Sequence, residues 1–342
     1  MDAVVSIADL SRLSGVSVAT VSRALNGYPD VSAATRARIE QLARETGYTP
    51  SEAARTLVRG KSSLVGVVWS RTYDDEAPHA FLHEVLDAMR DELARQGYDL
   101  LLLSPPSCDS GDRPDTLVRR ARQLRLAGVM VMGVEPDDPA VVALAESDVP
   151  TVVLDLDLSG PSTRRVTSDN AGGGALAARH LVEIGRTRLA VITGEIALPM
   201  ARERLEGFLA EAERAGLEVP AERVRSVGFQ LGPGKAAMHE LLALPEPPDG
   251  VFAAGDMAAI GVLLAAAEEG VDVPGQVAVV GYDDVRQAAY VSPPLTTVRQ
   301  DVTAIGTAAA AEVLALSASP VESTEPLVLP VRLVVRGSTV SA

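Results

Sequence analysis

Residues 1–49 contain three short stretches in which apolar positions recur every three or four residues. This spacing predicts three short amphipathic helices. A serine precedes each stretch and would cap it, at Ser6, Ser17 and Ser32. Gly15 separates the first two stretches as a tight turn requires, and two short helices joined in this way and supported by a third form a helix-turn-helix. The apolar positions are Ile7, Leu10, Leu13, Val21, Ala24, Leu25, Ile39, Leu42 and Ala43.

Beyond residue 61 the pattern changes to short, continuous apolar runs that alternate with amphipathic stretches. Such runs are typical of parallel strands covered on both faces, and the stretches between them are typical of helices. The alternation predicts βαβ units in doubly wound sheets, and about 280 residues indicate two lobes. A ligand would bind at strand carboxyl ends, in the cleft between the lobes. The expected strands are 64–69, 100–103, 129–132, 152–154, 189–193, 251–254 and 277–280, and the expected helices are 80–96, 115–125, 139–147, 172–184, 201–215, 235–244, 258–269 and 302–316.

The segment TPSEAARTLVRGK at residues 49–61 joins the two parts. It is either a linker or a helix of about two turns, which alone would be marginal in water. A segment that orders only on DNA fits this description. Leu57 has no apolar core partner inside the segment. Its side chain either wedges between base steps in the minor groove and kinks the duplex, or packs on the body.

Charge divides the chain in the same way as the hydrophobic pattern. The 342 residues have a net charge of −15, yet residues 1–61 hold eight basic and six acidic side chains and are net positive. This asymmetry suggests an electrostatically distinct N-terminal module. The single cysteine excludes a disulfide framework and a Cys-rich zinc module. With no signal peptide and no apolar run near the roughly 20 residues that span a bilayer, we expect a cytoplasmic protein without a membrane partner.

The exposed face of the second predicted helix carries side chains that suit DNA. Arg23 could donate two hydrogen bonds to the O6 and N7 atoms of guanine, and Val18 and Ala19 could contact a thymine methyl group. The Ser22 hydroxyl and the helix N-terminus could hold phosphates. A protein-binding three-helix module with the same caps also fits, because helix-turn-helix geometry is widely reused.

The run IADLSRLSGVSVATVSRALN at residues 7–26 resembles the head of the Lac repressor/Gal repressor family of bacterial transcriptional regulators. Residues 54–57 resemble its hinge helix, although Ser51 stands where the family usually has Asn. The resemblance implies that Val18 and Ala19 read the operator and that Leu57 is the minor-groove wedge. The DNA-binding residues that it implies are Ser17, Val18, Ala19, Thr20, Ser22, Arg23, Asn26, Ser32, Arg55 and Leu57.

Further motifs extend the resemblance over nearly the whole chain: DN at 169–170, ARERLEGF at 201–208, VAVVGYDD at 277–284 and SPPLTTVRQ at 292–300. They imply an α/β fold with an N-terminal all-α helix-turn-helix head and a two-lobed, doubly wound body like that of periplasmic binding proteins, with three crossovers between the lobes. The expected division is a head at 1–49, a hinge helix or linker at 50–61, and a body at 62–342, with lobe one at about 62–165 and 292–322 and lobe two at about 166–291 and 323–342.

The resemblance also implies a small-molecule effector, a sugar or sugar derivative, in the cleft. Carboxylates accept hydrogen bonds from hydroxyls, arginine donates a rigid fork, and an aromatic ring covers the apolar face of a sugar. Each such residue could instead form a structural ion pair or cap. Residues 70–82 form a longer segment than the family has there, so the identity of the effector does not carry over. The implied effector-binding residues are Phe81, Asp155, Arg204, Phe229, Asp256, Asp283 and Gln300.

These features predict a ligand-responsive repressor that binds a pseudo-palindromic operator in double-stranded DNA as a homodimer. The sequence holds no Walker loop, GxSxG or HExxH motif, so we expect neither catalysis nor a cofactor. His79 and His83 have a spacing that can bind a metal, but no third histidine or cysteine is nearby and no metal is expected. The alternatives on the same body are a solute-binding protein, which would need an export signal, and a cytosolic enzyme, which would need a reactive constellation.

Overall fold

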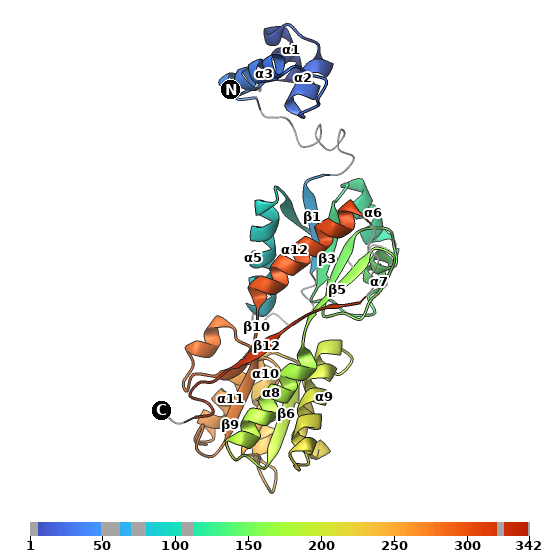
Figure 1. Cartoon of the computed structure of the whole chain (residues 1–342). Coiled ribbons are helices and arrows are strands. Elements are labelled where there is room, and N and C mark those ends of the chain that lie inside the picture. Colours follow the sequence, from blue (N-terminus) through green and yellow to red (C-terminus); the bar gives the residue numbers. More distant parts are fainter. Residues whose placement is uncertain (1–5, 49–61, 70–79, 104–112, 320–324, 341–342) are drawn as a thin grey trace. The chain divides into compact units, whose positions relative to one another are not determined.

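The computed structural model describes residues 6–48, 62–69, 80–103, 113–319 and 325–340. The chain forms two compact units, one containing the N-terminal helices and the other containing the α/β body (Figure 1). The predicted hinge at 50–61, with Arg55 and Leu57, lies outside the described residues, as do His79 and most of the long segment at 70–82.

The N-terminal unit is a bundle of three helices, α1 (Ile7–Ser14), α2 (Val18–Leu25) and α3 (Ala33–Thr46). The three predicted serine caps are present, and Ser6 forms a full capping box with Asp9. Gly15 ends α1 with a φ of 70°, a conformation that glycine adopts without strain. The core contains Leu10, Val21, Ala24, Val31, Ile39 and Ala43. Leu13 does not face this core, since it is 55% exposed.

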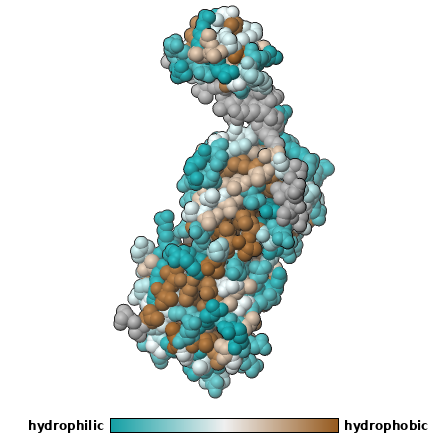
Figure 2. Space-filling model, in the orientation of Figure 1, coloured by the Kyte–Doolittle hydropathy of each residue, from teal (hydrophilic) through white to brown (hydrophobic). Residues whose placement is uncertain are grey.

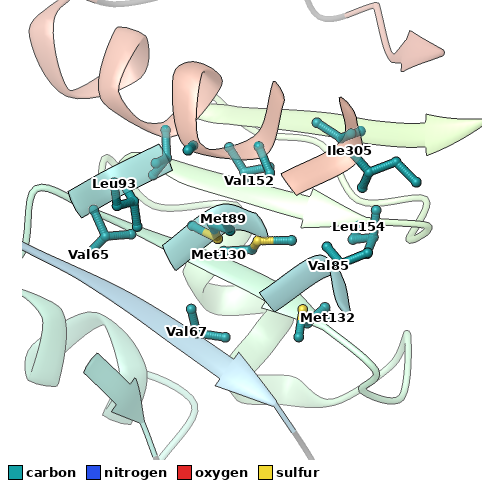
Figure 3. Close-up of a cluster of buried hydrophobic side chains, with 14 of the residues drawn as sticks. Val65, Val67, Val85, Met89, Leu93, Met130, Met132, Val152, Leu154 and Ile305 are labelled. Atoms are coloured by element: carbon teal, nitrogen blue, oxygen red, sulfur yellow. The ribbon is translucent and has the colours of Figure 1, made fainter. Parts of the chain in front are cut away.

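Lobe one of the body is a six-stranded parallel sheet with the order β2-β1-β3-β4-β5-β11. Its strands are β1 (Leu64–Trp69), β2 (Asp99–Leu103), β3 (Gly128–Met132), β4 (Thr151–Leu154), β5 (Thr163–Ser168) and β11 (Leu327–Leu329), and its helices are α5 (Ala80–Arg95), α6 (Thr116–Gln123), α7 (Pro139–Ala145) and α12 (Val302–Ala318). Figure 3 shows its core, where Val67, Met130 and Leu154 of the sheet meet Met89 of α5 and Ile305 of α12. The continuous apolar strands predicted this burial.

Lobe two repeats the arrangement with the order β7-β6-β8-β9-β10-β12, in which only β12 is antiparallel. Its strands are β6 (Leu189–Thr193), β7 (Val224–Ser226), β8 (Gly250–Ala253), β9 (Ala278–Asp283), β10 (Thr296–Gln300) and β12 (Val331–Val334), and its helices are α8 (Asn170–Glu183), α9 (Pro199–Arg214), η1 (Ala221–Arg223), α10 (Leu231–Leu242), α11 (Asp256–Glu268) and η2 (Arg286–Ala289). One apolar core joins α8 and α9 to the sheet and another joins α10 and α11. The α/β class and the two doubly wound lobes are thus confirmed.

The chain passes between the lobes at three single residues: Asp169 after β5, Asp301 after β10 and Pro330 after β11. The predicted return to lobe one at residue 292 is wrong, because β10 pairs with β9 and β12 in lobe two. The predicted boundary at about 165 lies a few residues too early, because β5 pairs with β4 up to Val166 and with β11 up to Ser168. The predicted start of the last lobe-two segment at 323 is also wrong, because β11 pairs with β5 in lobe one. Sequence patterning missed β5 and β10 because their residues, TRRVTS and TTVRQ, are not continuous apolar runs.

Candidate functional site: an inter-lobe pocket and an exposed helix face

A pocket lies between the two lobes of the body, at the carboxyl ends of their strands. Five of the seven implied effector-binding residues line it, and they come from both lobes. The place agrees with the general rule for ligand sites in doubly wound sheets. The lining residues are Phe81, Leu82, Gly133, Val134, Leu154, Asp155 and Leu156 from lobe one, and Leu198, Met200, Arg204, Phe229 and Asp283 from lobe two.

The two pocket carboxylates occupy equivalent places in the two lobes. Asp155 follows β4 and Asp283 ends β9, and these are the fourth strands of their lobes along the chain. Both residues have positive φ values, 57° for Asp155 and 111° for Asp283. Such conformations are uncommon outside glycine, and they concentrate where a fold holds side chains for function. Each strand end therefore turns sharply at the residue that meets the pocket.

Arg204 of α9 lies at the centre of a buried network in lobe two. Its side chain is 5% exposed, its Nε donates to Asn170 Oδ1 at 2.9 Å, and its Nη1 donates to the Ala254 carbonyl at 2.8 Å. The guanidinium also lies 3.7 Å from the centre of the Tyr282 ring, a cation–π contact. Its Nη1 is 3.8 Å from Asp283 Oδ1. These partners fix the guanidinium at the pocket wall.

Glycines allow the close helix crossing that places Arg204 beside Asn170. A Cβ atom on Gly174 of α8 would lie 2.0 Å from the Arg204 carbonyl oxygen, and one on Gly207 of α9 would lie 2.0 Å from the Ala171 carbonyl oxygen. Since both obstacles are backbone atoms, neither position accepts a side chain without shifting a helix. Of the glycine run at 172–174, Gly174 serves this packing, whereas Gly173 lies against the Tyr282 ring.

Burial dominates the electrostatics of both pocket carboxylates. Burial raises the pKa of Asp155, although Arg204 and the hydroxyl of Thr167, which donates at 2.7 Å, act against the rise. Burial likewise raises the pKa of Asp283 to about 6 against the opposing effects of Arg204 and Gln300. Both groups therefore gain from a ligand that donates hydrogen bonds to their charged forms.

Asp256 and Gln300 are not among the residues that line the pocket. Asp256 is fully buried and accepts hydrogen bonds from the Val285 N–H at 2.9 Å and the Thr297 hydroxyl at 2.6 Å, so it joins α11 to the segment after β9 and to the start of β10. Gln300 is 2% exposed, and its Nε2 donates to Asp283 Oδ1 at 2.7 Å. As effector contacts both stay predictions: Asp256 is held by these internal hydrogen bonds, and Gln300 bonds Asp283, which does line the pocket.

Sequence reasoning missed Asn170 as a site residue and most of the apolar wall. Asn170 appeared only as a motif position, and nothing local showed that it would accept from Arg204 across two helices. Val134, Leu154 and Leu156 follow or end predicted strands, so the strand-end rule was a usable signal for them. Leu198 and Met200 were hidden because the helix was predicted to begin at 201, whereas α9 begins at Pro199.

The exposed face of α2 in the head presents most of the implied base-reading residues. Ser17, Ala19, Val18 at 44% and the Arg23 side chain at 59% are exposed. The Arg23 guanidinium donates to Asp30 Oδ2 at 3.0 Å. Thr20, Ser22 and Asn26 are half-buried, and Asn26 Nδ2 donates to the Ser22 carbonyl at 2.8 Å. Ser32 is exposed and caps α3.

Two further observations concern metals and membranes. In the described ranges, no group of three His, Cys, Asp or Glu side chains could hold a metal ion. His83 instead stacks edge-on against Trp69, with ring centres 4.5 Å apart. None of the described helices combines the length and the apolar character needed to cross a membrane.

Comparison with known proteins decides the family. Residues 6–51 match the family model of bacterial regulatory proteins of the lacI family, and residues 178–339 match a periplasmic binding protein-like domain. The ribose operon repressor of Escherichia coli K12 is 31% identical over 331 residues, which cover 96% of this chain and 98% of that one. The chain belongs to the lacI family of bacterial regulatory proteins.

Other lacI-family members show how far the likeness extends. The HTH-type transcriptional repressor PurR of Mannheimia succiniciproducens is 31% identical over 305 residues, 88% of each chain. The structure of the Lac repressor dimer bound to operator and the anti-inducer ONPF has a TM-score of 0.83 at 28% identity, covering 98% of this chain and 99% of that one. A complex of the regulator CelR with cellobiose has a TM-score of 0.73 at 32% identity with the same coverage. The chain is thus a lacI-family transcriptional regulator with a helix-turn-helix DNA-binding head and an effector-binding body.

Proposed function

We propose that this regulator represses transcription as a homodimer on a pseudo-palindromic operator, and that a sugar or sugar-derived effector in the inter-lobe pocket controls its affinity for DNA. The observation that carries the proposal is the presence, in one chain, of a helix-turn-helix with an exposed α2 face and a pocket walled by both lobes. A ligand held by both lobes binds their two relative orientations with different affinity. Such coupling is typically worth 1–3 kcal/mol and is reciprocal.

The α2 face supports operator reading. Val18 and Ala19 lie at the N-terminal end of α2, where a recognition helix contacts base edges, and the exposed Arg23 can reach guanine. Two heads would read the two half-sites. Arg55 and Leu57 complete the proposal as hinge residues at the centre of the operator, where paired Leu57 side chains would unstack a base step.

Exposed apolar surface on the body supports self-association. Figure 2 shows apolar areas on the viewed face of each lobe. Leu264 of α11 is 44% exposed, and Tyr290, which follows η2, is 87% exposed. The related Lac repressor was solved as a dimer on its operator. Sedimentation velocity of the purified full chain should give a dimer, and a monomer at micromolar concentration would contradict this part of the proposal.

The decisive experiment is in vitro selection from random duplex DNA with the full-length protein and no added ligand. We expect one palindrome to be enriched. Leu57→Ala should weaken binding to that palindrome far more than binding to random DNA. If selection with and without cell extract enriches no sequence, the protein is not a sequence-specific regulator and the proposal fails.

A matched pair of arginine variants tests the reading face. Arg23→Ala should relax base preference at one position per half-site by about 1–3 kcal/mol. Arg12→Ala is the control, because Arg12 is also exposed and also paired with an aspartate, Asp9, but belongs to α1. An equal, position-independent loss in both variants would show that Arg23 contacts only the DNA backbone.

A further inference from the structure

The walls of the inter-lobe pocket are mostly apolar. Eight of its twelve described lining residues have apolar side chains, and they come from both lobes. Leu156 and Leu198 are 2% and 3% exposed, so the apolar wall is continuous with the packed interior. A free sugar has hydroxyls around its whole rim, and those facing such a wall would lose their water without gaining a partner.

Two glycines let an aromatic ring take space that polar side chains could otherwise fill. A Cβ atom on Gly194, just after β6, would lie 2.3 Å from the Phe229 ring, and one on Gly255, just after β8, would lie 3.0 Å from it. Both positions are strand carboxyl ends, where side chains normally meet a ligand. Phe229 therefore sits between two strand ends that contribute no side chain.

Among the described lining residues the polar groups are three: the carboxylates of Asp155 and Asp283, which accept hydrogen bonds, and the guanidinium of Arg204, which donates them. Arg204 donates from Nε to Asn170 and from Nη1 to the Ala254 carbonyl, which uses two of its five N–H groups. The described lining therefore favours a ligand whose hydroxyl groups lie at one end, toward Asp155, Asp283 and Arg204.

Charge argues against an anionic ligand. Two carboxylates and one guanidinium are among the described lining residues. Glu135 follows the lining residue Val134 in lobe one, and Glu195 of lobe two is near enough to raise the pKa of Glu135, together with burial and Asp137. A phosphate would enter a site whose described charges are mainly negative.

We propose that the pocket binds an uncharged ligand with a hydroxyl-bearing end for the two carboxylates and a large aryl or alkyl group for the apolar wall, an aryl glycoside in chemical class, and not a free or phosphorylated sugar. This inference rests on the proposed effector role of the pocket. It makes Gly194 and Gly255 specificity-determining residues, because they admit Phe229.

The test is isothermal titration of the full-length protein with matched sets of the common hexoses and pentoses. Each set contains the phenyl glycosides of both anomers, the corresponding methyl glycosides, the free sugar and its terminal phosphate. We expect at least one phenyl glycoside to bind about thirtyfold more tightly than its methyl counterpart, because burying a ring removes much apolar area from water. No phosphate should bind. Equal affinity of phenyl and methyl glycosides, tighter binding of a phosphate, or no binding anywhere in the set overturns the inference.

Two methionine variants show whether the preference arises in this wall. Met200 and Met257 are both half-buried and both the second residue of a helix, but only Met200 is among the lining residues. Met200→Gln should reduce the phenyl-to-methyl preference at least fivefold, and Met257→Gln should leave it unchanged. Equal effects of the two variants would contradict the assignment of the wall.

Operator binding separates this inference from the proposed function. If a palindrome is selected and a free sugar, but no phenyl glycoside, changes its affinity, the proposed function stands and the ligand class is wrong. If a phenyl glycoside binds with the stated preference but leaves operator affinity unchanged, the ligand class stands and effector control fails.

Discussion

The two lobes share one strand order, yet they surround the pocket with different chemistry. β4 and β9 are corresponding strands, and each delivers one carboxylate, Asp155 or Asp283, to the pocket. Lobe one adds mainly apolar side chains to Asp155, whereas lobe two adds the buried guanidinium of Arg204. The fold therefore decides where a strand-end side chain lies, and the neighbouring helices decide what it can bind.

The difference between the lobes is also one of sensitivity to substitution. In lobe two, one network connects Arg204 to Asn170, the Ala254 carbonyl and Asp283. Removing a member of a buried polar network leaves its partners unsatisfied, which costs more than the interaction itself gained. Substitutions in this network should therefore have larger effects than substitutions around Asp155.

The largest expected effect is that of Arg204→Met. It leaves Asp283 without its cation and the Asn170 and Ala254 oxygens without their donor, so the free energy of unfolding should fall by about 3–5 kcal/mol. Arg202→Met, on the same helix with a half-buried side chain, should change it by less than about 0.5 kcal/mol. Urea denaturation measures the free energy of unfolding of both variants. Equal losses would show that the Arg204 network contributes no more to stability than an ordinary half-buried arginine.

Asp283→Asn should change how stability depends on pH. The folded-state pKa of Asp283 is about 6, above the ordinary 3.8, so this group stabilises the fold fully below about pH 4 and loses that contribution as pH rises to about 6. Since Asn does not titrate, the unfolding free energy of the variant relative to wild type should rise by about 2–3 kcal/mol from pH 4 to pH 7. Denaturation at both pH values measures this, and a constant difference would refute it.

Asp155→Asn should reduce the stability of the protein less than the substitutions in the Arg204 network do. Asn keeps an oxygen that can accept from the Thr167 hydroxyl, and the wall around it is mainly apolar. We expect a loss of about 1 kcal/mol or less at neutral pH, with the same sign of pH dependence as at Asp283. If Asp155→Asn costs more stability than Arg204→Met in the same assay, lobe one is the more sensitive lobe and the proposed contrast is wrong.

The smallest expected effect concerns an ion pair between the lobes. Glu203 Oε1 of α9 lies 3.8 Å from Arg165 Nη2 of β5, and Glu203 Oε2 accepts a hydrogen bond from Asn170 Nδ2 at 3.2 Å. Glu203→Gln keeps an acceptor for Asn170 but removes the charge, so stability should fall by less than about 1 kcal/mol, and the difference from wild type should shrink in high salt. An effect that does not depend on salt would show that the charge of Glu203 is irrelevant.

The features predicted best from the sequence are those that depend only on neighbouring residues. Serine caps, the glycine turn at Gly15 and continuous apolar strands such as β3 are set by neighbours in the chain, and the structure confirms them. The polar strands β5 and β10 were missed because their residues carry no such pattern. The predicted lobe boundaries next to these strands were therefore wrong. Only pairing between distant strands reveals them.

The site was predicted in part for the same reason. Asp155 and Asp283 follow apolar strands, so position and resemblance agreed on them. Whether a polar residue faces a pocket or the interior depends on tertiary contacts: Asp256 follows a strand just as they do, yet it bonds the Val285 N–H and the Thr297 hydroxyl. The apolar wall, assembled from both lobes, has no local signature at all.

The three single-residue crossovers also bear on how the body is made by the ribosome. The last strands of both sheets, β11 and β12, flank Pro330, and α12, which forms part of the lobe-one core, begins only at Val302. A nascent chain that has emerged up to residue 300 therefore lacks the α12 side of lobe one and one edge strand of each sheet. Although domains generally fold in turn as they emerge, neither lobe can be completed before the other has been almost wholly synthesised. The two lobes can therefore be completed only together, once α12, β11 and β12 have emerged.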